Sequence, residues 1–277
     1  MIAVEERLPF LRAIAANPAD DLPRLVFADF LDETGEPDSV ARAHFIRAQI
    51  ALAQLPEGSP EYREAQALQE RLLWMYGDDW IWDLPEHLHR GSLPAWRRGF
   101  IEFVRMPWHT FAEDAELFDS VPITRVQIIE LRMSRGTSAP ALAPIPHARR
   151  ITHLRLGPAA NSIRLASILA AAVGRGPSDS LVETRNFTAL THLDLSENII
   201  AGAVLVEFLF RFEQASFAPT LKLLDLSRVQ GLDDAVGNAL ATARGLESLD
   251  RLILKRTELS EPVRAMILRR CGDRVYF

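Results

Sequence analysis

Two histidines and one carboxylate have the clearest capacity for acid–base or metal chemistry in this chain. His153 and His192 occupy the same position in two copies of a recurring apolar pattern, and Asp194 lies two residues after His192. Imidazole and carboxylate groups that lie close together can bind a transition metal or transfer a proton. The pattern offers no obvious third ligand, and two histidines in one column are common by chance. We therefore predict that the protein is not an enzyme and uses no metal or cofactor.

The other reactive residues do not form a recognisable catalytic motif. The chain has no nucleophile elbow, phosphate-binding loop, dinucleotide fingerprint or zinc-protease motif. Its single cysteine, Cys271, excludes a disulfide within the chain and is interpreted as a packing residue. A group of N-terminal acidic residues lacks the spacing of a calcium loop, so we interpret them as helix caps and a solvated helix face. These are Asp20, Asp21, Asp29, Asp32 and Glu33.

The composition is that of a folded protein with a surplus of acidic residues. Of the 277 residues, 48% are hydrophobic and 25% are charged, and the net charge is −6. This charge disfavours broad nucleic-acid binding, which needs a basic surface. Neither a signal peptide nor a membrane-spanning segment is evident, so we expect a cytoplasmic protein with no membrane association.

The elements that would position the histidines are copies of an L-x-x-L-x-L pattern. Leu190 to Asn198 is the best-formed copy and extends to L-x-x-L-x-L-x-x-N. The copies begin at Ile101, Ile128, Ile151, Leu190, Leu221 and Leu249, which are 27, 23, 39, 31 and 28 residues apart. Helix-like segments lie between them at 111–118, 163–173, 203–212, 233–243 and 261–270, and a glycine-rich loop is expected at 174–180.

This pattern resembles the leucine-rich repeats of the ribonuclease-inhibitor-like class. The resemblance implies an α/β solenoid of about six units over residues 91–277, with parallel strands on the concave face and helices on the convex face. Only Asn198 fills the asparagine position of the repeat. Val275-Tyr276-Phe277 is expected to form a short final strand.

A small all-α module is expected over residues 1–90, ahead of the array. Four helices are predicted, near Leu8–Ile14, from Pro23, from Asp38 or Ser39, and over Glu61–Met75. The motifs in residues 8–50, such as Leu25-Val26-Phe27-Ala28-Asp29 and Arg42-Ala43-His44-Phe45, resemble the bacterial repeat-companion domain. That family is a module found ahead of repeat arrays, and the resemblance implies no catalytic activity.

The outward positions of the predicted strands would form one continuous surface. In the predicted frame Arg132 lies beside Arg155 and Asp194 lies beside Asp225, which gives a basic half and an acidic half. Separated charge with a few apolar anchors is typical of a protein-binding surface. The residues of this predicted surface are Arg105, Glu130, Arg132, His153, Arg155, His192, Asp194, Ser196, Leu223, Asp225, Arg251, Ile253 and Lys255.

These observations favour a non-enzymatic scaffold that binds a protein partner through the concave face, with no small-molecule substrate. One alternative is a regulatory, sensor or inhibitor subunit of a larger bacterial enzyme or defence complex, with the helical module as its docking piece. Another alternative is a hydrolase that uses the two histidines. The charges of the strand face could also be ordinary solvated residues.

Overall fold

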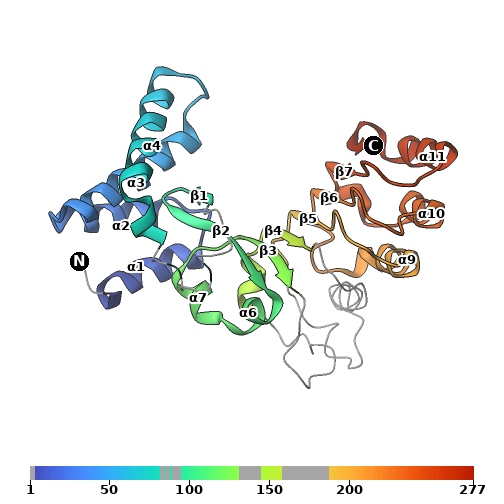
Figure 1. Ribbon diagram of the computed structural model, residues 1–277, viewed down its shortest axis with the longest axis horizontal. Helices are drawn as coiled ribbons and strands as arrows, with labels where there is room; N and C mark the ends of the chain where they lie inside the picture. The colour runs from blue at the N-terminus through green and yellow to red at the C-terminus, as the bar shows by residue number, and fades with distance from the viewer. Residues whose placement is uncertain (1–3, 82–83, 85–87, 89–94, 131–144, 158–186) are drawn as a thin grey trace. The chain divides into compact units, whose positions relative to one another are not determined.

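The computed structural model describes residues 4–81, 84, 88, 95–130, 145–157 and 187–277, and it divides the chain into two compact units (Figure 1). The first unit comprises Met1–Arg105 and Asp114–Thr124, and the second comprises Met106–Glu113 and Arg125–Phe277. The fold is mixed α/β, with helices at the N-terminus and mostly parallel strands after them. The expected helix at 163–173, the loop at 174–180 and Arg132 lie outside the described residues.

The N-terminal helices of the first unit confirm the four predicted from the sequence. They are α1 (Val4–Ala16), α2 (Leu22–Glu33), α3 (Pro37–Gln54) and α4 (Pro60–Ile81). A proline stands in the first turn of both α2 and α3, where its missing N–H costs no helical hydrogen bond. Gly35, with a φ of 66°, supplies the left-handed residue that separates these two helices.

An antiparallel hairpin packs against these helices within the same unit. It consists of β1 (Ala95–Arg97) and β2 (Phe100–Pro107), and Phe100 joins the core formed by Ile14, Phe27 and Ile46. Gly99, at the turn, donates its N–H to Gln49 Oε1 over 2.7 Å. A side chain at Gly99 would overlap Ile46, so the turn requires glycine for space as well as for its φ of 87°.

A buried ion pair ties α2 to this hairpin. Arg24 Nη2 donates to Glu102 Oε1 over 3.0 Å, and both side chains are almost fully buried. Thr124 Oγ1 donates to the other carboxylate oxygen of Glu102 over 3.4 Å. Burial raises the pKa of Glu102, and the nearby Arg24 opposes that rise. The pair therefore fixes the position of α2 on the hairpin, and removing one partner would leave a buried charge.

Short parallel strands and intervening helices make up the second unit. Each strand from β3 to β8 pairs in parallel with the next. The strands are β3 (Arg125–Glu130), β4 (His153–Leu156), β5 (His192–Asp194), β6 (Leu223–Asp225), β7 (Arg251–Ile253) and β8 (Val275–Tyr276). The helices are α6 (Trp108–Glu113), α9 (Gly202–Phe210), α10 (Asp234–Thr242) and α11 (Glu261–Cys271). The final strand β8 confirms the one expected at Val275.

The leucines of the recurring pattern form the core of this unit, as their spacing predicted. Leu193, Leu224 and Leu252 are buried at the centres of β5, β6 and β7. The pattern positions on either side of each are buried as well. Helix α10 packs between α9 and α11, and these helices cover the face of the strands that carries the leucines (Figure 1). Each fully buried leucine contributes roughly 1.5–3 kcal/mol relative to an exposed one.

The predicted frame of the second copy is wrong. Val126 and Ile128, rather than Leu131 and Met133, lie opposite Leu154 and Leu156. The sequence holds two overlapping frames, because Ile123-x-x-Val126-x-Ile128 matches the pattern as well as the copy at Ile128. In the observed frame the β-branched side chains of Val126 and Ile128 are buried, and β-branched residues pack well in strands.

The helix expected over 111–118 is also divided in the structure. Helix α6 ends at Glu113, and α7 (Ala115–Ser120) begins directly after Asp114. The Asp114 side chain accepts the N–H of Leu117 over 3.1 Å, which caps α7 and interrupts a continuous helix.

Candidate functional site

The residues that flank the buried leucines lie on the opposite face of the parallel strands, in two rows. The strand register places Arg125, His153, His192, Leu223 and Arg251 side by side, and we call this set the first row. The second row is Gln127, Arg155, Asp194, Asp225 and Ile253. The predicted neighbours His153 and His192 are confirmed, and so are Asp194 and Asp225.

The two histidines of the first row stack face to face. The ring centroids of His153 and His192 are 3.9 Å apart, and the ring planes differ by 9°. Each Nδ1 lies beside the hydroxyl of the preceding threonine, at 2.9 Å from Thr152 Oγ1 and 2.8 Å from Thr191 Oγ1. The ring stacking and the threonine hydroxyls therefore fix the orientation of both imidazole rings.

The hydrogen bonds of Thr191 favour one tautomer of His192. The Thr191 hydroxyl donates to the backbone carbonyl of Thr152 over 2.9 Å. In this arrangement the same oxygen accepts from His192, and we assign the ring proton to Nδ1. In the neutral ring this leaves Nε2, on the opposite side, with a lone pair that can accept a hydrogen bond or a proton.

Burial and positive charge lower the pKa of His192. Burial of the ring is the largest cause, and the guanidinium groups of Arg125 and Arg251 add to it from the two sides of the row. The His192 imidazole is therefore neutral at neutral pH, although the chain as a whole is acidic. Among the described residues no carboxylate contributes to this shift, which distinguishes the first row from the second.

The carboxylates of the second row are already engaged in the turns that follow the strands. Asp194 Oδ1 accepts the N–H of Ser196, and Asp225 Oδ1 accepts the N–H of Ser227, each over 2.8 Å. Arg155 Nε also lies 3.3 Å from Asp194 Oδ2. Both carboxylates of the predicted acidic half thus hold turn geometry, and that of Asp194 also pairs with an arginine.

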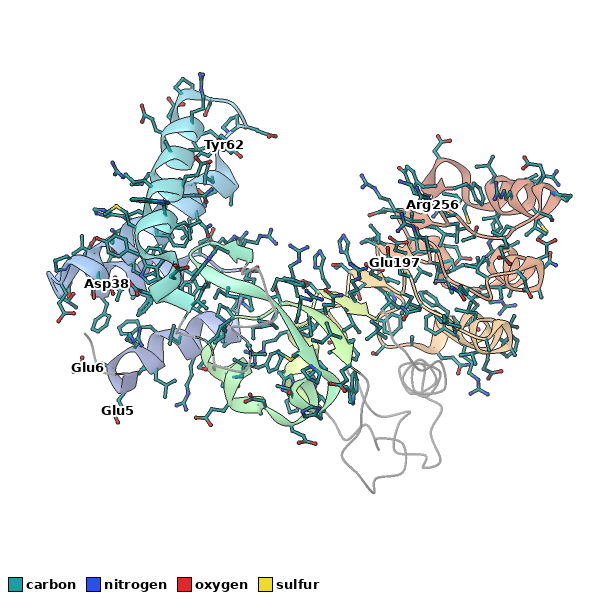
Figure 2. All side chains as sticks on the ribbon, viewed as in Figure 1. Glu5, Glu6, Asp38, Tyr62, Glu197 and Arg256 are labelled. Atoms are coloured by element: carbon teal, nitrogen blue, oxygen red, sulfur yellow. The ribbon has the colours of Figure 1, made fainter. Side chains whose placement is uncertain are left out.

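Beyond the second row, the turns expose three charged residues in a strained conformation. Glu197, Arg228 and Arg256 each adopt a positive φ, of 62°, 54° and 56°. Glu197 Oε1 accepts from Arg228 over 2.8 Å, and its other oxygen lies 3.5 Å from Arg155. Figure 2 labels Glu197 and Arg256, the first and last residues of this series.

Eleven residues of the predicted surface divide into three groups, Glu130 lies at the end of β3, and Arg132 is outside the described residues. His153, Arg155, His192, Asp194, Leu223, Asp225, Arg251 and Ile253 lie together in the two rows. Ser196 is buried in its turn and Lys255 is exposed in the equivalent turn after β7. Arg105 is an exposed residue of β2, in the first unit.

The corrected frame of β3 changes which residues complete the rows. Gln127, rather than Arg132, pairs in register with Arg155, and Arg125, rather than Glu130, pairs with His153. The prediction missed Arg125 and Gln127 because it took the other frame. Placing Ile123 at the first pattern position would have found both residues.

The Asn198 side chain stabilises the turn after β5 through hydrogen bonds to buried backbone carbonyls. Its side chain is fully buried, and Nδ2 lies 2.6 Å from Leu156 O, 2.8 Å from Leu195 O and 3.2 Å from Ser196 O. The equivalent position after β6 is Val229, which offers no donor, and after β7 it is Thr257, whose hydroxyl donates to Leu254 O over 2.9 Å. Asn198 therefore has a structural role beneath the strand face.

Neither a metal centre nor a membrane-spanning element is seen in the part of the chain that the structure describes. Within those residues, no cluster of three or more histidine, cysteine or acidic side chains is arranged to hold a metal ion. The same residues include no helix with the length and hydropathy needed to cross a bilayer. Burial raises the pKa of the Cys271 thiol, which makes it a poor nucleophile.

Comparisons of the chain with protein-family models, curated proteins and solved structures found no match.

Proposed function

We propose that the second unit is a leucine-rich-repeat solenoid of the ribonuclease-inhibitor-like class and acts as a non-enzymatic scaffold that binds a protein partner. The observation that carries this proposal is the in-register surface of the two rows, on the face of the strands away from the helices. The buried leucines, the parallel strands and the helices between them support the repeat class. Residues 8–50 are proposed to be the repeat-companion module of the array.

The composition of the two rows suits a protein rather than a small molecule. Leu223 and Ile253 are partly exposed on a face that otherwise carries charged and polar groups. Apolar contacts surrounded by charge give affinity at the centre of an interface, and orientation and specificity around it. The short strands place these groups on a broad surface, which can meet several side chains of a partner at once.

Charge reversal on the second row tests this proposal. Full-length protein carrying Arg155→Asp and Asp225→Arg would be used to capture partners from the native cell, with identification by mass spectrometry. A matched variant, Arg269→Asp with Glu261→Arg, changes exposed charges on α11 instead. We expect the first variant to lose partners that the wild type and the matched variant retain, with circular dichroism showing that all three are folded. Equal capture by all three proteins would refute the strand-face proposal.

A second candidate is a regulatory, sensor or inhibitor subunit that docks through its helical module. It is favoured by apolar side chains on the surface of the first unit: Trp74 is 87% exposed and Met75 is 52% exposed, both on α4. Full-length protein with Trp74→Glu would distinguish the two candidates. Loss of a native complex with this variant, together with an unaffected complex in the strand-face variant, would favour the docking role.

We also propose that the protein acts in the cytoplasm. The single cysteine supports this, because the chain can fold without any internal disulfide. Imaging of a fluorescent fusion would test it, and signal outside the cytoplasm would refute it.

A further inference from the structure

Within the part of the chain that the structure describes, the first row carries two arginines without carboxylate partners. Arg125 and Arg251 lie at its two ends, and among the described residues neither has an ion-pair partner or a side-chain hydrogen bond. The buried Nε of Arg125 lacks a hydrogen-bond acceptor within the same described ranges. A chain with net charge −6 has ample carboxylates to pair these arginines, so their isolation points to a partner that supplies the acceptors.

Several other arginines of the second unit have carboxylate partners, whereas Arg244, Arg256 and Arg269 are exposed and have none among the described residues. Arg228 pairs with Glu197 at 2.8 Å, and Arg270 pairs with Glu247 at 3.0 Å. Arg155 is shared between Asp194 and Glu197. Asp194 and Glu197 are thus engaged by arginines of the second row and the turns, and no described carboxylate pairs with an arginine of the first row.

Two groups of this row can change their charge, His153 and His192, and His192 is the one midway between the two arginines. The charged and titratable groups around it come from four other strands and from its own strand. They are Arg125 on β3, His153 and Arg155 on β4, Asp194 on β5, Asp225 on β6 and Arg251 on β7. Asp194 and Asp225 are bound by turn amides. Arg125 and Arg251 therefore dominate the electrostatic effect on His192, and they add to the lowering of its pKa by burial.

We infer, building on the proposed function, that the first row binds an acidic segment of the protein partner and that His192 takes up a proton from solvent when it binds. Arg125 and Arg251 would each pair with a carboxylate, and the protonated Nε2 of His192 would donate to a third carboxylate between them. Nδ1 of His192 keeps its bond to Thr191 throughout, so the ring need not turn. Leu223, which lies between His192 and Arg251, offers an apolar contact for the segment.

The geometry of the row sets the length of this segment. Arg125 and Arg251 are separated by four strand steps, which is about 19 Å at about 4.8 Å per step. An extended peptide advances about 3.3 Å per residue, so about six residues would span the row. Carboxylates near both ends of such a segment, with one near its middle, match the positions of Arg125, His192 and Arg251.

A protein segment fits this row better than a nucleic acid does. A nucleic-acid backbone carries a dense, continuous line of phosphates and needs continuous neutralisation along its path. The first row provides only separated charges, and the carboxylates of Asp194, Asp225 and Glu197 lie beside it. Isolated carboxylates on a peptide can be placed at the arginines and away from these acidic groups.

The test uses a fluorescein-labelled decaglutamate peptide with the full-length protein. Fluorescence anisotropy gives its Kd at pH 8 and pH 6, a range in which glutamate stays ionised. Titration calorimetry in two buffers of different ionisation enthalpy gives the number of protons taken up for each peptide bound. We expect binding to tighten by at least about threefold as the pH falls, with a fraction of one proton taken up. Decalysine and a ten-nucleotide oligothymidylate serve as the comparison ligands.

Two double variants separate the row from general charge effects, and a third variant tests His192. Arg125→Gln with Arg251→Gln should weaken decaglutamate binding about tenfold or more, since two charge-assisted contacts are lost. Arg244→Gln with Arg269→Gln removes the same charge from exposed positions outside the rows and should leave Kd unchanged. His192→Asn, whose amide can still donate to Thr191, should abolish the proton uptake while the arginines continue to bind.

Several results would overturn the inference. Equal weakening in the two double variants would mean that no specific row exists, and tighter binding of oligothymidylate than of decaglutamate would assign the row to a polyphosphate. Zero proton uptake by the wild type would remove the role of His192. Failure to bind decaglutamate, while Arg155→Asp with Asp225→Arg still abolishes partner capture, would refute this inference and leave the proposed function standing.

Discussion

Replacing Asn198 with alanine should lower the free energy of unfolding of the second unit by about 2–4 kcal/mol. The Asn198 amide lies within hydrogen-bonding distance of three backbone carbonyls, those of Leu156, Leu195 and Ser196. Its two N–H groups can make two full bonds, and the bonds to Leu156 and Leu195 are the shortest. Alanine would leave both carbonyls without this donor in a buried site.

The magnitude follows from the cost of an unsatisfied buried carbonyl, which is about 1–3 kcal/mol. Two such groups give the range stated, with its upper end reduced because water can enter the space that the amide leaves. Thr257→Val provides the matched control. It removes one hydrogen bond, from Thr257 Oγ1 to Leu254 O, at the equivalent position after β7 and preserves the shape of the side chain. Its expected cost is about 1 kcal/mol.

Hydrogen exchange measured by mass spectrometry in increasing urea is the suitable assay. It resolves peptides from residues 187–277 and so reports on the second unit alone, which matters because two compact units need not unfold together. A loss below about 1 kcal/mol in Asn198→Ala, or a loss no larger than that of Thr257→Val, would show that the buried carbonyls do not depend on the Asn198 amide. The turn carbonyls would then be satisfied by other donors.

Three further predictions concern the packing and charge of the two units. Gly231→Ala should cost at least about 3 kcal/mol by thermal unfolding, because Gly231 has a φ of 94° and a Cβ there would overlap the carbonyl oxygen of Ile200. Arg24→Ala should cost the first unit about 3–5 kcal/mol by leaving Glu102 buried and unpaired, whereas Arg24→Met with Glu102→Leu should recover most of it in a urea titration. Burial and two arginines hold the pKa of His192 below its ordinary value of 6.5, so the folded state resists protonation. The second unit should therefore be most stable above pH 6.5 and lose stability as the pH falls toward the lower folded pKa, and His192→Asn should remove that part of the pH dependence.

The apolar spacing of the sequence predicted much of the second unit, for a physical reason. A leucine repeated at the same position in successive strands is buried in every copy, as Leu193, Leu224 and Leu252 are. The same spacing placed His153 beside His192, because strands with the same inward residues align in register. The frame of β3 could not be chosen this way, since Ile123 and Ile128 both begin a matching pattern. Only the pairing with β4 distinguishes the two frames.

The hydrogen bonds and protonation states of the strand face were harder to predict from the sequence. The repeated Asp-Leu-Ser at Asp194 and Asp225 is visible in the chain, and a carboxylate two residues before a turn amide is a recognisable capping arrangement. The proton on His192 Nδ1 is different, because it depends on a bond from Thr191 to the carbonyl of Thr152, 39 residues away. Interactions between repeats of unequal length cannot be read from a spacing of leucines.

Site-specific photo-crosslinking in the native cell tests directly whether the strand face binds a protein partner. A photoreactive amino acid would replace Leu223 in the first row and, in a separate protein, Leu268, which is exposed on α11. If the strand face binds a protein partner, the probe at Leu223 will form a crosslinked product of defined mass and the probe at Leu268 will not. A crosslink at Leu268 with none at Leu223 would refute binding at the strand face and place the interface on the helices.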